Sequence, residues 1–318
     1  MGNVLPTWSH TRPLPDAESR LQIIDVSDPG EPAWRGKYDS LGHVSAVSVV
    51  SSLAYVTDEA SGLQIIDLSN PANPIWRGVY DTPGYAMAVS VVGSLAYVAD
   101  GSGLQIIDVS NPANPTSRGE AIVQGSVNGV DVMNGLAYVT DGGGLQIIDV
   151  TDPTNPFLRG RCDTLGTTQN VSVVGSLAYV VAWDYGLQII DVSNPDLPYL
   201  RSAYDTPGFA QGISLLNNFA YVADGSSGLQ IIDVSNPANP FLLGEYDTPR
   251  FAESVSVAGS LAYVADEAGL QIIEVSDPAN PILRGAYDTP GESADVSAVG
   301  DLVYLTAREG GLLILRIH

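Results

Sequence analysis

The chain has 318 residues and a formal net charge of −23 at pH 7, because 36 acidic residues stand against 13 basic ones. Such a field repels phosphate backbones and anionic lipids, so we expect no nucleic-acid partner. No run approaches the roughly 20 apolar residues that span a bilayer, so no membrane insertion is expected. A single cysteine, Cys162, excludes an internal disulfide and a multi-cysteine metal site.

One motif recurs along the chain with a period of 41 or 42 residues. The string LQII occurs seven times, and a degenerate eighth copy, LLIL, follows near the C-terminus. The copies begin at Leu21, Leu63, Leu104, Leu145, Leu187, Leu229, Leu270 and Leu312. Because a four-stranded propeller blade needs about 40 to 50 residues, this period predicts a radial array of such blades.

Each repeat divides into four predicted strands, named A to D in chain order. In the second repeat, residues 86–92 predict strand A, residues 95–100 (LAYVAD) strand B and residues 103–110 (GLQIIDVS) strand C. The segment NPANP, residues 111–115, ends strand C because its prolines lack a backbone donor, and an outer strand D follows. Strands B and C are apolar at nearly every position, which requires burial on both faces of the sheet.

The chain begins and ends on a copy of strand C, which predicts a closed ring rather than an open solenoid. We therefore predict an all-β, closed seven-bladed propeller of four-stranded antiparallel blades over residues 21–318, preceded by an extension over residues 1–20. The N- and C-terminal strands would share one blade.

Eight copies of strand C compete for seven places. The C-terminal copy, residues 312–317, follows strand B through a tight turn and should take the place in the ring, since local closure costs less entropy. The N-terminal copy, residues 21–26, should then become a fifth, outermost strand or pair with a neighbouring molecule, which would allow self-association.

Units of the form AYVADGSGLQIIDVSNPANP followed by RGxYDTPG resemble the LVIVD repeat family of bacterial and archaeal proteins over residues 21–317. The resemblance implies a propeller, common in exported or surface-attached proteins, with no established family-wide catalytic residues. On that basis we expect an extracellular or cell-surface location. Residues 1–20 lack the apolar core of a signal peptide, so either a leader was removed or the chain is cytoplasmic.

Variation among the repeats concentrates where strand A begins. The D-to-A connections and the B-to-C turns should share one face, which we call the variable face. One variable column reads His43, Tyr85, Ser126, Thr167, Phe209, Phe251 and Glu292, and the second reads Ser45, Met87, Asn128, Gln169, Gln211, Glu253 and Ala294. A ligand could have set these positions, since loops on a rigid scaffold usually carry function, or they could have drifted at exposed sites.

Aromatic and ionisable residues add to these columns. Trp183 and Tyr185 occupy a B-to-C turn that elsewhere tolerates glycine, so they could stack on a sugar or an aromatic ligand or simply pack over the channel mouth. The predicted ligand-binding residues are His43, Tyr85, Gln169, Trp183, Tyr185, Phe209, Gln211, Arg250, Phe251, Glu253, Glu292 and Arg308.

Several ionisable groups belong to repeats that become neighbours once the ring closes. Paired carboxylates can perform general acid and base catalysis, so candidates for catalysis are Glu253, Glu292, Asp295 and His43. No cofactor or metal is expected. The recurring acids at Asp67 and Asp100 could bind calcium, but capping of the adjacent turn is the favoured interpretation.

Three classes of function are consistent with these features of the sequence. The leading hypothesis is a non-catalytic extracellular module that binds a protein or a glycan on the variable face. The second is a carbohydrate-active enzyme, a polysaccharide lyase or glycoside hydrolase, with an acidic site between the sixth, seventh and first repeats. The third is a structural subunit of a surface layer or filament.

Overall fold

The computed structural model describes residues 20–26, 33–39, 43–123, 125–289, 291–300, 302–307 and 311–317, and it describes the backbone alone for the first two ranges and the last. The predicted extension, apart from its last residue, lies outside these ranges. The described regular elements are strands and one 3₁₀ turn, Trp183–Tyr185. Within the described residues, no helix is long and apolar enough to cross a membrane.

Six sheets have four strands each and are antiparallel throughout. The first contains β3 (Val44–Val50), β4 (Leu53–Asp58), β5 (Gly62–Asp67) and β6 (Ile75–Tyr80). The second contains β7 (Ala88–Val92), β8 (Leu95–Ala99), β9 (Gly103–Asp108) and β10 (Thr116–Ile122). The third contains β11 (Gly129–Met133), β12 (Leu136–Thr140), β13 (Gly144–Asp149) and β14 (Phe157–Asp163).

The next three sheets repeat the same order of strands. The fourth contains β15 (Thr168–Val174), β16 (Leu177–Ala182), β17 (Gly186–Asp191) and β18 (Tyr199–Tyr204). The fifth contains β19 (Gly212–Leu216), β20 (Phe219–Ala223), β21 (Leu229–Asp233) and β22 (Phe241–Tyr246). The sixth contains β23 (Ala252–Ala258), β24 (Leu261–Asp266), β25 (Gly269–Glu274) and β26 (Ile282–Asp288).

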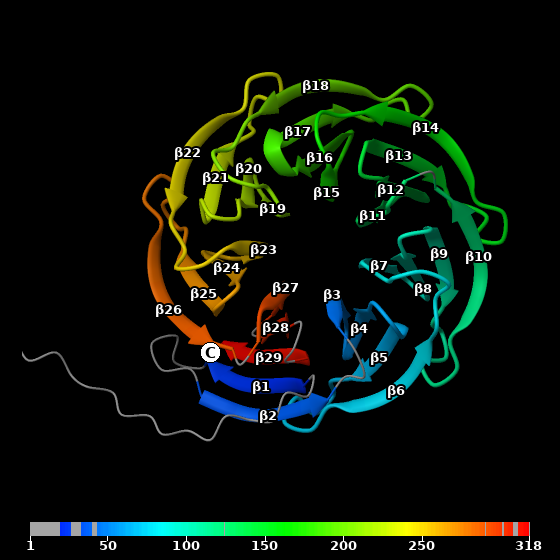
Figure 1. Cartoon of the computed structure of the whole chain (residues 1–318), viewed down its shortest axis with the longest axis vertical. Helices are drawn as coiled ribbons and strands as arrows, with labels where there is room; N and C mark the ends of the chain where they lie inside the picture. Colours follow the sequence, from blue (N-terminus) through cyan, green and yellow to red (C-terminus); the bar gives the residue numbers. More distant parts are fainter. Residues whose placement is uncertain are drawn as a thin grey trace, which may run out of the picture.

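These sheets are the blades of a β-propeller, as predicted from the repeats. Figure 1 shows them radiating from a central axis, with the predicted A strands innermost and the D strands on the circumference. The apolar pattern of strands B and C explains the arrangement, because Leu104, Ile106 and Ile107 of β9 are fully buried. One apolar cluster joins Ile106 to Val130 and Val139 of the next blade, so neighbouring blades share their cores.

A five-stranded sheet contains both ends of the described chain. It consists of β1 (Arg20–Val26), β2 (Ala33–Asp39), β27 (Ser293–Val299), β28 (Leu302–Ala307) and β29 (Gly311–Ile317). Their order is β2-β1-β29-β28-β27, and β1 runs parallel to β29. The C-terminal copy of strand C thus pairs with β28, as predicted, and the terminal strands share one sheet.

The predicted position of the N-terminal copy is wrong. β1 lies between β29 and β2 instead of outside β2, so this sheet has five strands and one parallel pair. The reason is that β1 keeps the hairpin that strand C forms with strand D in the other blades. Leu21 faces Tyr38 as Leu63 faces Tyr80, and both hairpins have the same bulge. Because β1 is paired on both edges, it is not the free strand on which the predicted self-association depended.

A glycine in strand D marks the contact between successive blades. A Cβ atom on Gly160 would lie 2.3 Å from the carbonyl oxygen of Pro195, in the NPxxP loop of the next blade. Gly119 meets Pro153 in the same way, at 2.2 Å. In the fourth blade, Ser202 replaces this glycine and its hydroxyl donates a 2.6 Å hydrogen bond to the carbonyl of Pro237. The Arg-Gly pair of strand D and the NPxxP segment of the next blade are therefore complementary surfaces.

Candidate functional site

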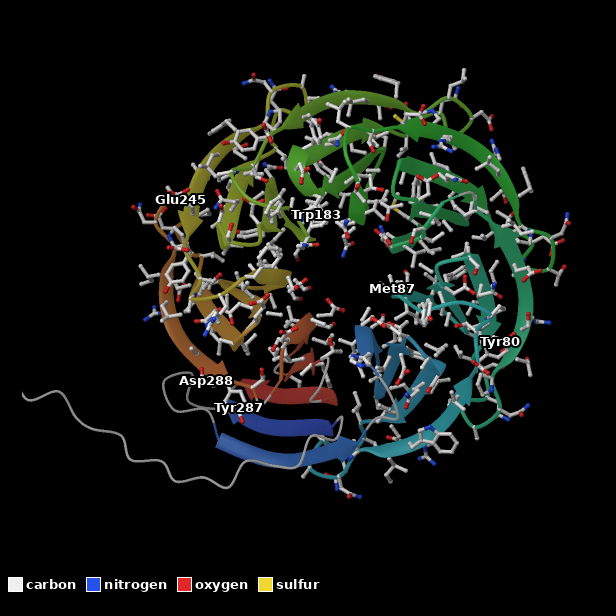
Figure 2. The ribbon with its side chains drawn as sticks, viewed as in Figure 1. Tyr80, Met87, Trp183, Glu245, Tyr287 and Asp288 are labelled. Carbon is white, nitrogen blue, oxygen red and sulfur yellow. The ribbon has the colours of Figure 1, made fainter. Side chains whose placement is uncertain are left out.

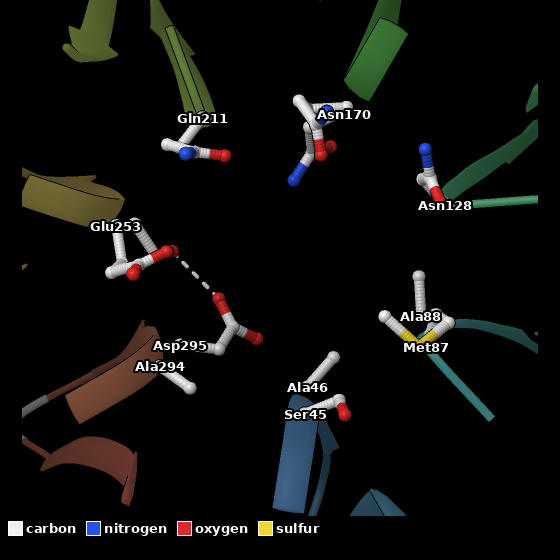
Figure 3. A pocket seen from close by; sticks show the side chains of 12 residues that line it. Ser45, Ala46, Met87, Ala88, Asn128, Asn170, Gln211, Glu253, Ala294 and Asp295 are labelled. Carbon is white, nitrogen blue, oxygen red and sulfur yellow. Dashed lines mark hydrogen bonds between the residues drawn. The ribbon is translucent and has the colours of Figure 1, made fainter. Parts of the chain in front are cut away.

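The second variable column lies at the centre of the propeller. All seven of its residues line one cavity of about 160 Å³ on the axis; they are Ser45, Met87, Asn128, Gln169, Gln211, Glu253 and Ala294. Figure 3 shows polar groups of this set converging from different blades. One of the two variable columns thus forms a continuous wall around the axis.

Backbone hydrogen bonds hold three of these residues at the point where the innermost strand begins. The amides of Met87, Asn128 and Gln211 each donate to a carbonyl at the end of the neighbouring B strand, at 2.7, 3.1 and 2.9 Å. The turn that precedes each strand can therefore vary while the residue in the channel keeps its place. This local pairing explains why side-chain identity at the column is free to change from blade to blade.

Asp295 joins three sheets in the channel wall. Its Oδ1 accepts a 2.6 Å hydrogen bond from the hydroxyl of Ser254, and its Oδ2 accepts a 2.8 Å bond from the amide of Val47 (Figure 3 draws the first). Burial raises the pKa of this carboxyl above its usual range, and these hydrogen bonds offset part of the effect. Asp295, predicted as a catalytic candidate, is therefore engaged in contacts between blades.

Asn170 and Ser254 also line the cavity, although the sequence reasoning did not select them. Their position holds alanine or glycine in four of the other repeats and Asp295 in the remaining one. This position lies one residue after the second variable column, and its change from small to polar residues can be read from the sequence. It would have added both residues to the predicted wall of the channel.

Three aromatic residues of the predicted set form a cluster beside the channel. The ring centroids of Trp183 and Phe209 are 5.6 Å apart at an interplanar angle of 62°, and those of Phe209 and Phe251 are 6.4 Å apart at 27°. Trp183 and Phe209 each keep 42% of their surface exposed. Figure 2 shows Trp183 and Met87 near the axis, far from Tyr80 and Glu245 on the outer strands.

The aromatic cluster, Trp183, Phe209 and Phe251, also confirms which loops share a face. Trp183 belongs to a B-to-C turn, whereas Phe209 and Phe251 belong to D-to-A connections. The carbonyl of Trp183 accepts a 3.0 Å hydrogen bond from the amide of Ala210, so the two kinds of loop are tied together. Phe251 covers Gly225, where a Cβ atom would lie 2.7 Å from the ring. The variable face is therefore a continuous surface.

The other predicted aromatic residues lie apart from this cluster. Tyr85 is 67% exposed and lines a second cavity of about 510 Å³, together with Glu59 and Asp100. Tyr185 packs against Gly166, since a Cβ atom there would lie 2.4 Å from the tyrosine ring. The predicted aromatic residues thus lie in three places. Trp183, Phe209 and Phe251 form the cluster, Tyr85 lines a cavity of its own, and Tyr185 covers Gly166.

Of the predicted ionisable residues, the structure brings Glu253 and Asp295 together at the cavity on the axis. His43 is exposed, and its carbonyl accepts a 2.9 Å hydrogen bond from the amide of Glu59. Arg250 and Glu292 are both exposed where their D-to-A connections reach β23 and β27. Arg308 lies outside the described residues.

The recurring acids cap turns, which confirms the favoured interpretation. Asp100 accepts hydrogen bonds of 3.0 and 2.9 Å from the amides of Ser102 and Gly103. Hydrogen bonds from Ser69 and Arg77 lower the pKa of Asp67 to about 2. In the part of the chain that the structure describes, no group of three or more His, Cys, Asp or Glu could hold a metal ion.

Among the acids that follow strand B and cap the next turn, Asp224 has the pKa furthest from its ordinary value. It is fully buried, and burial raises its pKa to about 6, an effect that Thr206 and Gly208 oppose by donating hydrogen bonds. The Thr206 hydroxyl lies 2.5 Å from Oδ1, and the Gly208 amide lies 2.7 Å from Oδ2. This carboxyl therefore fixes the D-to-A connection that carries Phe209.

Comparison with known families identifies the repeat. The family model of the LVIVD repeat matches seven segments, residues 16–40, 41–82, 83–121, 124–164, 165–206, 207–248 and 249–289. No curated protein sequence matches the chain. The sequence prediction that the units resemble LVIVD repeats is confirmed.

Several solved structures are similar to the chain over most of its length. A functionally unknown protein from Desulfotomaculum acetoxidans is 15% identical, with 94% of this chain and 96% of that chain covered and a TM-score of 0.70. The β-propeller domain of Myceliophteria thermophila Cps50 (Swd1) is 13% identical, with 88% and 98% covered and a TM-score of 0.72. The WD40 repeats of RRP9 are 9% identical, with 85% and 88% covered and a TM-score of 0.71. At these identities the likeness shows the fold alone.

Proposed function

The chain belongs to the LVIVD repeat family, and we propose that it is a non-catalytic binding module that holds a protein or glycan ligand on its variable face. One observation carries this proposal. The residues that differ between otherwise near-identical repeats gather around one cavity on the propeller axis. Equivalent positions of strand A form a ring around the axis in any propeller, and here that ring offers a different set of side chains in each repeat, as a site fitted to an asymmetric ligand requires.

The scaffold for this site is, we propose, a closed ring of seven blades. The five-stranded sheet would be the seventh, and the family model matches seven repeats. Contacts across the junction support closure, because Tyr304 of β28 packs in one apolar cluster with Val44 and Val47 of β3. The hydrogen bond from the Val47 amide to Asp295 spans the same junction. A closed ring would hold the residues of the channel in fixed register.

The aromatic cluster supports binding at the same face. Solvent-exposed rings in contact with one another offer apolar area and π-faces to a ligand at little cost in conformational entropy. Trp183 and Phe209 remain 42% exposed although a propeller core could have buried them. Of the catalytic candidates, Asp295 already accepts hydrogen bonds from Ser254 and Val47, which weighs against an acid or base role for this residue.

The proposal includes a location outside the cytoplasm, as the resemblance to exported LVIVD proteins implies. Fractionation of the producing cells, followed by immunodetection in the surface and cytoplasmic fractions, would test it. Detection in the cytoplasmic fraction alone would contradict this part of the proposal without affecting the binding site.

The binding function is tested with a glycan array and a peptide array probed with the labelled full chain. Phe209→Ala should abolish binding of any ligand found, because it removes the centre of the aromatic cluster. Phe241→Ala is the matched control, since Phe241 is 47% exposed but lies on the outer strand β22. A ligand that survives Phe209→Ala and is lost with Phe241→Ala would place the site elsewhere. No ligand on either array would favour the structural-subunit hypothesis.

A further inference from the structure

The chemistry of the channel mouth defines the class of ligand more closely. On the basis of the proposed binding function, we propose that the partner is a protein segment. This segment inserts a lysine or arginine side chain between the aromatic cluster and the channel. The cationic head would reach the carboxylate of Glu253, and the aliphatic stem would lie against the rings of Phe209 and Phe251.

The size of the cavity favours a single side chain. Its volume is about 160 Å³, which is room for about five water molecules at roughly 30 Å³ each. Pockets that enclose small-molecule ligands are larger, at about 300 to 1,000 Å³. A sugar ring or a folded loop would therefore not enter, whereas an extended lysine or arginine side chain would.

The wall of the cavity presents mainly hydrogen-bond acceptors and amides. Glu253 contributes a carboxylate, and Asn128, Gln169 and Gln211 contribute carbonyl oxygens of side-chain amides, while the Asp295 carboxyl already accepts hydrogen bonds from Ser254 and Val47. Among the described residues that line this cavity there is no lysine, arginine or histidine. An anionic or strongly acidic ligand would meet like charge there, while an ammonium or guanidinium would meet acceptors on several sides.

The aromatic cluster lies on the path to those acceptors. Phe209 and Phe251 stand two residues before Gln211 and Glu253 in the same segments of chain. A cation over the face of an aromatic ring is attracted by the ring quadrupole, and tryptophan is the strongest partner. The same rings would cover the aliphatic stem of the inserted side chain.

The distribution of charge over the two faces points to the same ligand. On the opposite face, arginines of the D strands pair with the acids that end the C strands. These pairs are Arg77 with Asp67, Arg118 with Asp108, Arg159 with Asp149, Arg201 with Asp191 and Arg284 with Glu274.

On the variable face Arg161 pairs with Asp141 and Asp163, but four exposed acids have no such arginine partner among the described residues. The exposed carboxylates of Asp81, Asp184, Asp205 and Asp247 take part in none of the ion pairs between described residues. Negative potential on this face would steer a basic segment toward the channel. Arg250 is an exposed cation beside Phe251, so the ligand backbone should run on the side of Phe209 and Trp183.

The test uses the full chain and a set of immobilised nonapeptides with a central Lys, Arg, acetyl-lysine, Gln or Glu in randomised flanks. We expect Lys and Arg peptides to be retained and the other three classes to be lost. Glu253→Gln should weaken Lys-peptide binding roughly tenfold, since it removes the charge that faces the cation. Glu274→Gln is the matched control: it makes the same change on the opposite face and should leave affinity unchanged. Raising salt from about 0.05 M to about 0.5 M should weaken binding as well.

Each outcome separates this inference from the proposed function. Equal retention of Gln and Lys peptides, or wild-type affinity in Glu253→Gln with an unchanged melting temperature, would overturn the cationic ligand. Binding of a neutral glycan or an acidic peptide that Phe209→Ala abolishes would leave the binding function standing and overturn this inference alone. Absence of binding by any peptide or glycan would contradict both.

Discussion

The backbone amide of Val47 donates a 2.8 Å hydrogen bond to Oδ2 of Asp295, and these two residues lie 248 positions apart in the chain. The bond connects β3, the innermost strand of the first repeat, with β27, the innermost strand of the last. Asp131 makes the same kind of contact between the third and fourth blades, where its Oδ2 accepts a 2.8 Å bond from the amide of Val173. With the bond from Ser254 to Oδ1 of Asp295, carboxylates thus link adjacent A strands at three junctions.

Removal of the Asp295 carboxylate should destabilise the propeller. Asp295→Ala leaves the Val47 amide and the Ser254 hydroxyl without their acceptor, so we expect a loss of about 1 to 3 kcal/mol in the free energy of unfolding. Asp295→Asn keeps an acceptor oxygen and should lose less. Urea denaturation measures both, with Glu245→Ala on an outer strand as the control. Equal stability of the Ala variant and the wild type would show that this bond does not hold the junction.

Asp224 should give the protein a distinct dependence of stability on pH. Its pKa is raised to about 6 in the folded chain from an ordinary value of 3.8. Between these values the folded state binds more protons than the unfolded state, so this group's contribution to stability is present at low pH and is lost as pH rises through about 6. A shift of this size corresponds to at most about 3 kcal/mol.

Asp224→Asn, which cannot titrate, should lack this decline between about pH 4 and pH 6. Chemical denaturation at a series of pH values compares the two proteins. Asp205→Asn is the control, because Asp205 is exposed and contributes a smaller, coulombic part of the same shift. A slope shared by the wild type and Asp224→Asn would assign the pH dependence to other groups.

The glycine of strand D should be required wherever the next NPxxP loop presses against it. Gly160→Ala places a Cβ atom 2.3 Å from the Pro195 carbonyl, so the loop must move, at a cost of about 1 to 3 kcal/mol. Gly160→Ser should cost less than Gly160→Ala, because Ser202 shows that a hydroxyl at this position can bond the facing carbonyl. Thermal unfolding ranks the two variants. A serine variant less stable than the alanine variant would contradict this explanation.

The sequence predicted the blades well because each repeat encodes them locally. The burial of Leu104, Ile106 and Ile107 follows from the unbroken apolar run in strand C, and the turn after Asp100 follows from an acid beside glycine. The apolar position in the middle of strand A is buried in six repeats and partly buried at Val89; the six are Val47, Val130, Val171, Ile213, Val255 and Val296.

Contacts between repeats could not be predicted in the same way. Trp183, Phe209 and Phe251 come from three different repeats, and no pattern in the chain specifies the distance between their rings. Asp295 was predicted as a catalytic candidate because ring closure brings its repeat beside other ionisable groups, whereas its carboxyl accepts hydrogen bonds from Val47 and Ser254. The period of the repeats does not predict such contacts between residues far apart in the chain.

The place of β1 leads to the last prediction. Its backbone is paired with β29 on one edge and with β2 on the other, so its donors are used within the sheet. Ile24→Pro removes a donor from this doubly paired strand and introduces a ring where neighbouring strands lie close. We expect a loss of about 3 kcal/mol.

Arg35→Pro is the matched control, because Arg35 lies in β2 at the bulge, opposite no residue of β1, and β2 is the outer strand of the sheet. Proline is tolerated at edges and bulges, so this variant should stay close to wild type. Amide hydrogen exchange on β29 gives the decisive measurement. Ile24→Pro should expose the amides of β29 that face β1, since the parallel pairing from Gln22 to Val26 would be interrupted. Unchanged protection of β29 would mean that the N-terminal strand does not pair there in solution.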